Sequence, residues 1–123
     1  PTSPLRKKNE IDKLIKKIIK QKGDSLISLC KLDDPHPYKL MKINNKKISF
    51  FKRNFKDVMN RQMMPELYMP SGNIYIISRK TLINNKTIHG QKYLYSLIDQ
   101  KYYLNIDNHD DLIIAKEKLK KLY

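Results

Sequence analysis

NEIDKLIKKIIKQKGDSLISLCKL, residues 9–32, is the stretch that decides the fold. Its first part repeats apolar side chains at the i, i+3, i+4, i+7 spacing of one helix face, namely Ile11, Leu14, Ile15, Ile18 and Ile19. We expect a helix over residues 9–22, with Asn9 as its N-cap. Gly23 is expected to take the left-handed conformation just past the helix end.

The apolar run from Ser25 to Leu32 follows this helix directly and predicts a buried strand. A helix and a strand at this distance form half of a βαβ unit, in which a helix connects two parallel strands. The sequence therefore predicts an α/β fold whose first strand would precede Pro1.

Two short strand-like runs, residues 38–43 and 48–51, flank Asn44-Asn45, a pair that favours a hairpin turn. The irregular segment 52–69 follows. It carries Met59, Met63, Met64 and Met69. Because this many exposed methionines are uncommon, we expect the segment to be partly buried, either by ordinary packing or in a subunit interface.

The second half of the chain predicts a strand, a helix, a strand and a helix. Residues 73–77 are β-branched and aromatic, which favours a strand, and residues 79–83 are expected to form a short helix. Residues 93–98 predict another strand. A closing helix is expected over residues 108–122, with Asn108 as its N-cap.

The 123-residue chain is expected to form one domain, and its formal charge of +14 is typical of proteins that bind nucleic acid or anionic membranes. Most of the 26 basic residues are lysines, however, and they accompany many Asn, Ile and Tyr residues, whose codons are A/T-rich. The lysines are also spread along the chain, whereas a nucleic-acid footprint is a patch or stripe. The sequence therefore favours solvated lysines over nucleic-acid binding.

Cys30 is the one cysteine, so a disulfide within the chain and a zinc site built from cysteines are excluded. Its apolar neighbours predict a small buried side chain. No apolar run reaches the roughly 18 residues that cross a bilayer, and the N-terminus lacks the pattern of a signal peptide. We expect a soluble cytoplasmic protein without a membrane partner.

Asn105 and Asp107 are candidate metal ligands on a predicted strand end before the last helix. Residues two apart in a strand share a face, so the Asn105 amide oxygen and the Asp107 carboxylate can converge on a hard cation such as Mg²⁺. An aspartate just before a helix is also a common cap. The sequence alone is compatible with both roles.

Three stretches of the chain, taken in order, resemble the C-terminal half of the acylneuraminate cytidylyltransferases. They are PTSPLR at 1–6, PSGNIY at 70–75 and LNIDNHDD at 104–111. The resemblance implies CMP transfer from CTP to a nine-carbon 2-keto sugar acid of the sialic acid type, with release of pyrophosphate. It also implies a Rossmann-like nucleotidyltransferase fold with three α/β/α layers. In that fold, residues 38–70 would form a projecting β-hairpin arm that joins two chains in a homodimer.

The resemblance also implies roles for individual residues. Asp107 matches the second acid of the family's Asp-x-Asp motif, which holds Mg²⁺ against the CTP phosphates, whereas Asn105 departs from the first acid. Lys39 and Arg61 match basic residues of the substrate-facing arm, and Arg61 is expected to act with Asp107 in catalysis. The remaining expected substrate contacts are Thr2, Ser71, Asn73 and Tyr75.

Some positions depart from the family pattern. Met69 stands where many members carry an arginine, and Ile88 and His89 replace a phenylalanine pair, so the resemblance leaves the sugar open. With three glycines in all, the chain has no glycine-rich phosphate loop, and the family's CTP-binding half would lie upstream of Pro1. We therefore expect the chain alone to be inactive.

Two other classes of function stay open. A catalytically dead paralogue could keep the arm as a dimerising or regulatory module. A basic nucleic-acid-binding domain is the less favoured alternative.

Overall fold

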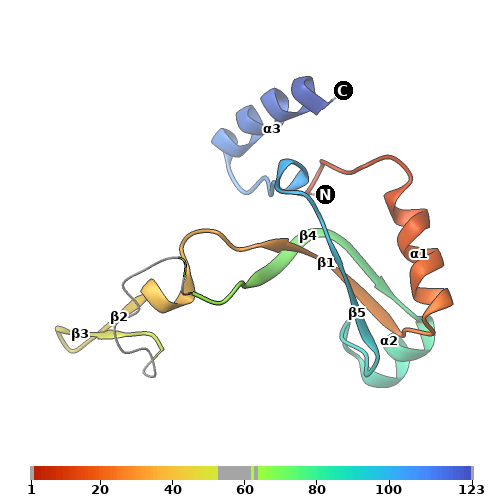
Figure 1. Cartoon of the computed structure of the whole chain (residues 1–123), viewed down its shortest axis with the longest axis horizontal. Helices are drawn as coiled ribbons and strands as arrows, with labels where there is room; N and C mark the ends of the chain where they lie inside the picture. The colour runs from red at the N-terminus through yellow and green to blue at the C-terminus, as the bar shows by residue number, and fades with distance from the viewer. Residues whose placement is uncertain (1, 53–61, 63, 123) are drawn as a thin grey trace. The chain divides into compact units, whose positions relative to one another are not determined.

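The computed structural model describes residues 2–52, 62 and 64–122 (Figure 1). The chain divides into two compact units, one made of Pro1–Cys30 with Pro70–Tyr123 and the other of Lys31–Met69. Within the described ranges, every helix is too short or too polar to span a bilayer.

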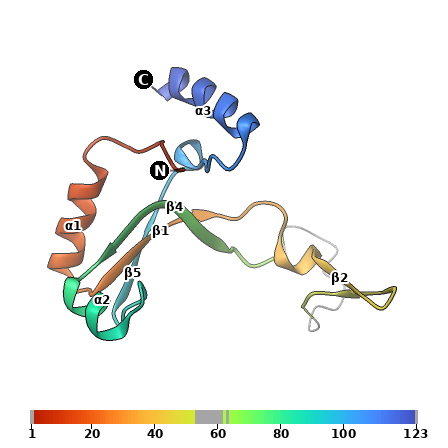
Figure 2. The ribbon, with the colours of Figure 1, turned by 180° about the vertical axis from the view of Figure 1, so that it is seen from behind.

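The first unit is built on a mixed sheet with strand order β4-β1-β5 (Figure 2). Its strands are β1 (Ser25–Lys31), β4 (Tyr68–Ile77) and β5 (Tyr93–Leu97). β5 runs parallel to β1, with Leu26 opposite Leu94. The C-terminal end of β4 lies beside the start of β1, where the Ser78 N–H donates to the Asp24 carbonyl at 2.8 Å. β4 is therefore antiparallel to β1. The strands predicted at residues 25–32, 73–77 and 93–98 and the α/β class are confirmed.

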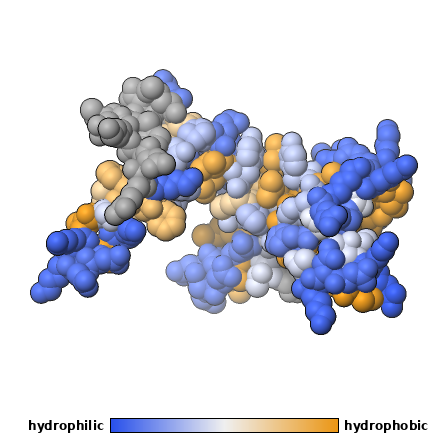
Figure 3. Space-filling view, turned by 90° about the horizontal axis from the view of Figure 1, so that it is seen from below, coloured by the Kyte–Doolittle hydropathy of each residue, from blue (hydrophilic) through white to orange (hydrophobic). Residues whose placement is uncertain are grey.

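Helix α1 (Glu10–Lys20) packs on this sheet through Leu14 and Ile18, which join Leu26 and Ile74 in the buried core. The other three apolar side chains of the predicted face, Ile11, Ile15 and Ile19, are exposed. The predicted apolar face is therefore wider than the surface that the described part of the sheet covers. Apolar side chains also reach the surface elsewhere, interspersed among hydrophilic ones (Figure 3).

The ends of α1 differ from the predicted caps. Asn9 has a φ of 60° and makes no side-chain cap hydrogen bond; instead, the Glu10 carboxylate accepts from the Lys7 N–H at 3.3 Å. At the other end Lys22, with a φ of 50°, takes the left-handed conformation predicted for Gly23. Gly23 is needed for space, because a Cβ there would lie 2.5 Å from the Leu94 Cδ1 atom.

The helices of the second half are where the sequence predicts them. They are α2 (Arg79–Asn85) and α3 (His109–Leu122), with a 3₁₀ turn, η3 (Gln100–Tyr102), between β5 and α3. Asn108 caps α3 as predicted, because its side-chain oxygen accepts from the Asp111 N–H at 3.0 Å. The Asp111 carboxylate in turn accepts from the Asn108 N–H at 3.1 Å, which completes a reciprocal capping box.

The second unit contains a 3₁₀ turn, η1 (Pro37–Lys39), and a hairpin of β2 (Met41–Asn44) and β3 (Lys47–Phe50). The hairpin turn is centred on Asn45 and Lys46, both at positive φ, one residue later than predicted. Residues 37–39 form the 3₁₀ turn instead of the predicted strand start, because the His36 side chain caps it and proline suits its first position. Of the four methionines predicted to be partly buried, Met59 and Met63 lie outside the described residues, and Met64 and Met69 are half-buried.

Candidate functional site

Three segments that are distant in the sequence meet around Gly72 in the first unit. The Ile106 N–H donates to the Thr2 carbonyl at 2.7 Å, and the Ser3 hydroxyl donates to the Asn105 side-chain oxygen. Gly72 lies against this contact with a φ of 76°, and a Cβ there would lie 2.8 Å from that Asn105 oxygen. These segments carry the three sequence motifs, so the structure brings Thr2 and Asn105 together with the 71–73 segment. We call this place the Gly72 junction.

Ser71 lies on the buried side of the junction. Its hydroxyl is 2.7 Å from the Ser28 hydroxyl and donates to the Ser28 carbonyl at 3.1 Å. The Ser28 hydroxyl accepts from the Ile74 N–H at 2.9 Å, so the two serines link β1 to β4. Both side chains are fully buried. Ser71 therefore has a structural role in addition to its predicted contact with substrate.

Asn73 is the second polar residue buried at the junction, with 5% of its surface exposed. Its amide nitrogen donates to the carbonyls of Leu5 at 3.0 Å and Tyr102 at 3.1 Å. Its amide oxygen is buried and has no hydrogen-bond partner in the described part of the chain. A buried acceptor of this kind is costly unless a water molecule or a ligand donates to it.

Asn105 and Asp107 are arranged differently from the prediction. Residues 103–107 form no strand; their described backbone bond to a distant segment is the one from Ile106 to Thr2. Asp107 is exposed, and its N–H donates to the Asp111 carboxylate at 2.9 Å, so the start of α3 positions it. The pKa of the neighbouring Tyr103 is raised, mainly by burial and in part by the negative charge of Asp107.

The described residues contain no group of three or more His, Cys, Asp or Glu side chains able to hold a metal ion. Asn105 and Asp107 together offer an amide oxygen and a carboxylate. Mg²⁺ often uses only one or two protein carboxylates and completes its octahedron with water and substrate phosphates. The pair is therefore compatible with a magnesium ion that arrives with a phosphate substrate, although the Ser3 hydroxyl already donates to the Asn105 oxygen.

The other predicted site residues are not part of the junction. Tyr75 lies further along β4 and is half exposed. Lys39 belongs to the second unit, where its ammonium group lies 3.6 Å from the Asp34 carboxylate. Arg61 lies outside the described residues.

Sequence reasoning missed His36, which is 5% exposed in the second unit. Its Nδ1 accepts from the Tyr38 N–H at 3.3 Å, and its Nε2 lies 3.2 Å from the Pro65 carbonyl. These bonds correspond to a neutral ring with its proton on Nε2. His36 therefore connects residues 36–38 to the later segment at Pro65, close to Lys39 in the chain.

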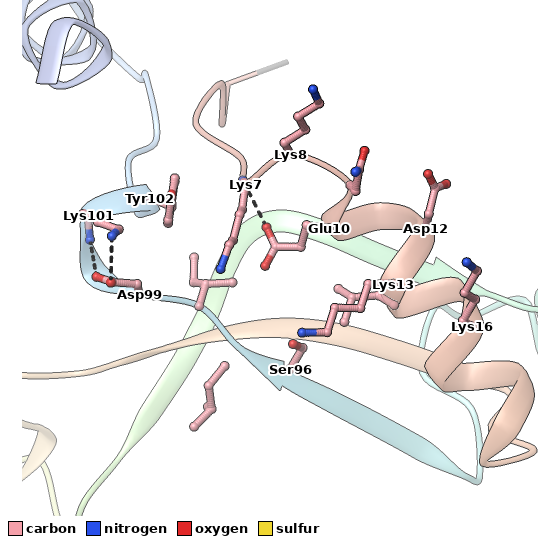
Figure 4. Close-up of a pocket in the computed structure, with 14 residues that line it drawn as sticks. Lys7, Lys8, Glu10, Asp12, Lys13, Lys16, Ser96, Asp99, Lys101 and Tyr102 are labelled. Carbon is pink, nitrogen blue, oxygen red and sulfur yellow. Dashed lines mark hydrogen bonds and ion pairs between the residues drawn. The ribbon is translucent and has the colours of Figure 1, made fainter. Parts of the chain in front are cut away.

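The first unit also contains a cavity of about 760 Å³ that no motif of the sequence indicates (Figure 4). It lies between the start of α1 and the segment that ends β5 and continues to Tyr102. Tyr102 also connects it to the Gly72 junction, because its carbonyl accepts from Asn73. Asp99 lies in the cavity wall, and the pKa of its carboxyl is lowered by the N–H and ammonium groups of Lys101 and by the Lys7 charge.

The chain matches no protein-family model, and a search of curated proteins finds no significant match.

Proposed function

We propose that the chain provides the sugar-acid side of an acylneuraminate cytidylyltransferase-like active site. The observation that supports this proposal is the Gly72 junction, where the three motif segments lie together although up to 102 residues separate their contacting side chains. A resemblance confined to sequence would not require these segments to meet. The Rossmann-like character of the sheet is part of the same proposal.

In the proposed reaction, the anomeric hydroxyl of a 2-keto sugar acid attacks the α-phosphate of CTP. A new P–O bond to the sugar forms, the bond to the pyrophosphate leaving group breaks, and the hydroxyl proton passes to solvent or a nearby base. Lys39 and Arg61 would hold the anionic groups of the substrates, and Asp107 with Asn105 would hold Mg²⁺, which supplies charge neutralisation when bound.

The CTP-binding part of such a site is not evident in these 123 residues, which contain three glycines and no glycine-rich loop. A separate polypeptide segment would have to supply the CTP-binding part of the site. We therefore expect the chain alone to bind the sugar acid without turning it over.

An NMR titration of the ¹⁵N-labelled chain with N-acetylneuraminate and other 2-keto sugar acids, in the presence of CTP and with and without Mg²⁺, tests this proposal. We expect saturable shifts of the amide signals of Gly72, Asn73 and Asn105. Asp107→Asn should remove the part that depends on Mg²⁺, whereas Asp110→Asn, a matched exposed aspartate at the start of α3, should not. Uniform or absent shifts would contradict the proposal.

A non-catalytic binding module is a second candidate, and a specific observation favours it. Asn105 replaces an acid, and its oxygen already accepts from Ser3. Pyrophosphate release can distinguish the two functions when the chain is supplemented with a polypeptide that carries a CTP-binding half. Release above that of the supplement alone indicates an enzyme, and sugar binding without release indicates the module.

A further inference from the structure

The cavity beside α1 has the character of an anion-binding site. Figure 4 shows Lys7 and Lys13 extending from the α1 side towards β5, and Lys101 stands on the opposite wall. The lining holds five lysines, Lys7, Lys8, Lys13, Lys16 and Lys101, and three acids, Glu10, Asp12 and Asp99, so its net charge is +2. The Asp99 carboxylate accepts from the Lys101 N–H at 3.0 Å and lies 3.5 Å from the Lys101 ammonium. The Glu10 carboxylate accepts from the Lys7 N–H at 3.3 Å, so two lysine charges remain in excess over the carboxylates of the lining.

A second hollow of about 410 Å³ extends this basic surface along α1. The two hollows share Lys13, Lys16 and Ser96, so they adjoin. Lys20 lines the second one, and neither it nor Lys16 forms an ion pair in the described part of the chain. All the lysines that line the two hollows lie within residues 7–20, on α1 and just before it, except Lys101.

The lining also indicates which anion would suit the site. It contains lysines but no arginine, and lysine binds phosphate as a point charge, whereas a carboxylate ligand is commonly held by the planar fork of arginine. Because the cavity has the volume of a small-molecule site, a single phosphate ion would fill little of it.

We propose that this cavity binds an anion that carries linked phosphate groups, with Lys7 and Lys13 as its principal ligands and Ser96 as a hydroxyl donor. Linked phosphates provide several negative charges within one small molecule. Leu97 and Ile98 in the lining leave an apolar surface beside them. This proposal does not rest on the proposed cytidylyltransferase function, because it uses none of the residues assigned to that function.

Isothermal titration calorimetry of the full chain with inorganic tripolyphosphate tests the site, and ATP distinguishes a nucleotide from a free polyphosphate. Both should bind if the phosphates alone are recognised; ATP should bind more tightly if the apolar surface is used. The double variant Lys7→Ala/Lys13→Ala should weaken binding about tenfold or more.

The matched control is Lys42→Ala/Lys47→Ala, which removes the same charge from the hairpin of the second unit. It should change the affinity less than twofold, roughly the effect expected of distant screened charges. The ¹⁵N spectrum of each variant shows whether it is folded. An equal loss in both variants would overturn the proposal, because the binding would then follow net charge. Preferential binding of a single-stranded oligonucleotide over both small anions would also overturn it.

Discussion

Gly72 illustrates how one residue without a side chain allows distant segments to meet. A Cβ at this position would lie 2.8 Å from the Asn105 side-chain oxygen and 2.9 Å from the Ser3 hydroxyl oxygen. The φ of 76° is also unfavourable for any residue with a Cβ. The requirement for glycine at 72 is therefore both steric and conformational.

We expect Gly72→Ala to destabilise the chain by about 2 kcal/mol, measured as a lower urea midpoint with an unchanged slope. Adding Asn105→Ala should recover part of this loss, because it removes the nearest obstructing side chain and leaves only the backbone strain. If Gly72→Ala is as stable as the wild type, the described junction is wrong.

The hydrogen bonds of the Asp24 carboxylate lead us to expect that the stability of the chain depends on pH. This carboxylate accepts from the N–H groups of Lys92 at 3.0 Å and Gln91 at 2.8 Å and from the Ser25 hydroxyl at 3.1 Å. The Lys92 N–H above all lowers the pKa of Asp24 below 3.8, although partial desolvation opposes the shift. The native state thus holds this proton less tightly than the unfolded chain. The stabilisation is present above the unfolded pKa and is lost as the pH falls through the folded value.

Asp24→Asn should therefore be less stable than the wild type near neutral pH, and the difference should shrink as the pH falls below about 4. Urea unfolding at several pH values measures it. Asp12→Asn is the control, because the Asp12 carboxylate makes no hydrogen bond within the described residues. If the difference in the free energy of unfolding between the wild type and Asp24→Asn does not change with pH, the negative charge of Asp24 is not the source of the stabilisation.

At the scale of elements, local signals were predicted more accurately than the contacts between elements. The cap of α3 could be predicted because Asn108 and Asp111 are three residues apart. The Ser28–Ser71 pair could not, because its partners are 43 residues apart and each serine alone resembles a surface residue. The prediction of the apolar face of α1 had the correct period but included too many residues, since periodicity does not reveal how much of a sheet lies beneath a helix.

The capping box of α3 makes a testable link between an element and the candidate site. Asn108→Ala should destabilise the first turn of α3 by about 1 kcal/mol, visible as faster amide exchange there. Because Asp111 also accepts from the Asp107 N–H, loss of the box should weaken the Mg²⁺-dependent shifts at Asn105. Asp110→Ala removes a first-turn charge outside the box and is the control. Unchanged exchange in Asn108→Ala would contradict the role of this cap.

For the whole molecule, the sequence predicted the α/β class and identified the three motif segments, but it could not predict that Lys101 lies in the cavity beside α1. The other lysines there lie within residues 7–20, whereas Lys13 and Lys101 are 88 positions apart in the chain and share the cavity only through the fold. Each is one of 26 basic residues, so neither is distinctive before the chain folds.

The homodimer that the family resemblance implies leads to the last prediction, which concerns the hairpin. Met41 pairs with Phe50 and Ile43 with Ile48, so the alternation of a strand puts all four on one face, while Lys42 is on the other. All four are exposed, Ile43 by 71% and Ile48 by 66%. An isolated two-stranded hairpin is marginally stable, and a second copy on its apolar face would bury these side chains.

We therefore expect light scattering of the wild-type chain to give twice the monomer mass of 14.7 kDa. Ile43→Lys/Ile48→Lys should give the monomer, because buried ammonium groups would be left unpaired in the interface. Lys42→Glu, on the opposite face of the same strand, should leave the dimer intact. A wild-type monomer, or a dimer that survives the double substitution, would show that the hairpin face is not the dimer interface, and Met41, Ile43, Ile48 and Phe50 would then need a different partner to cover them.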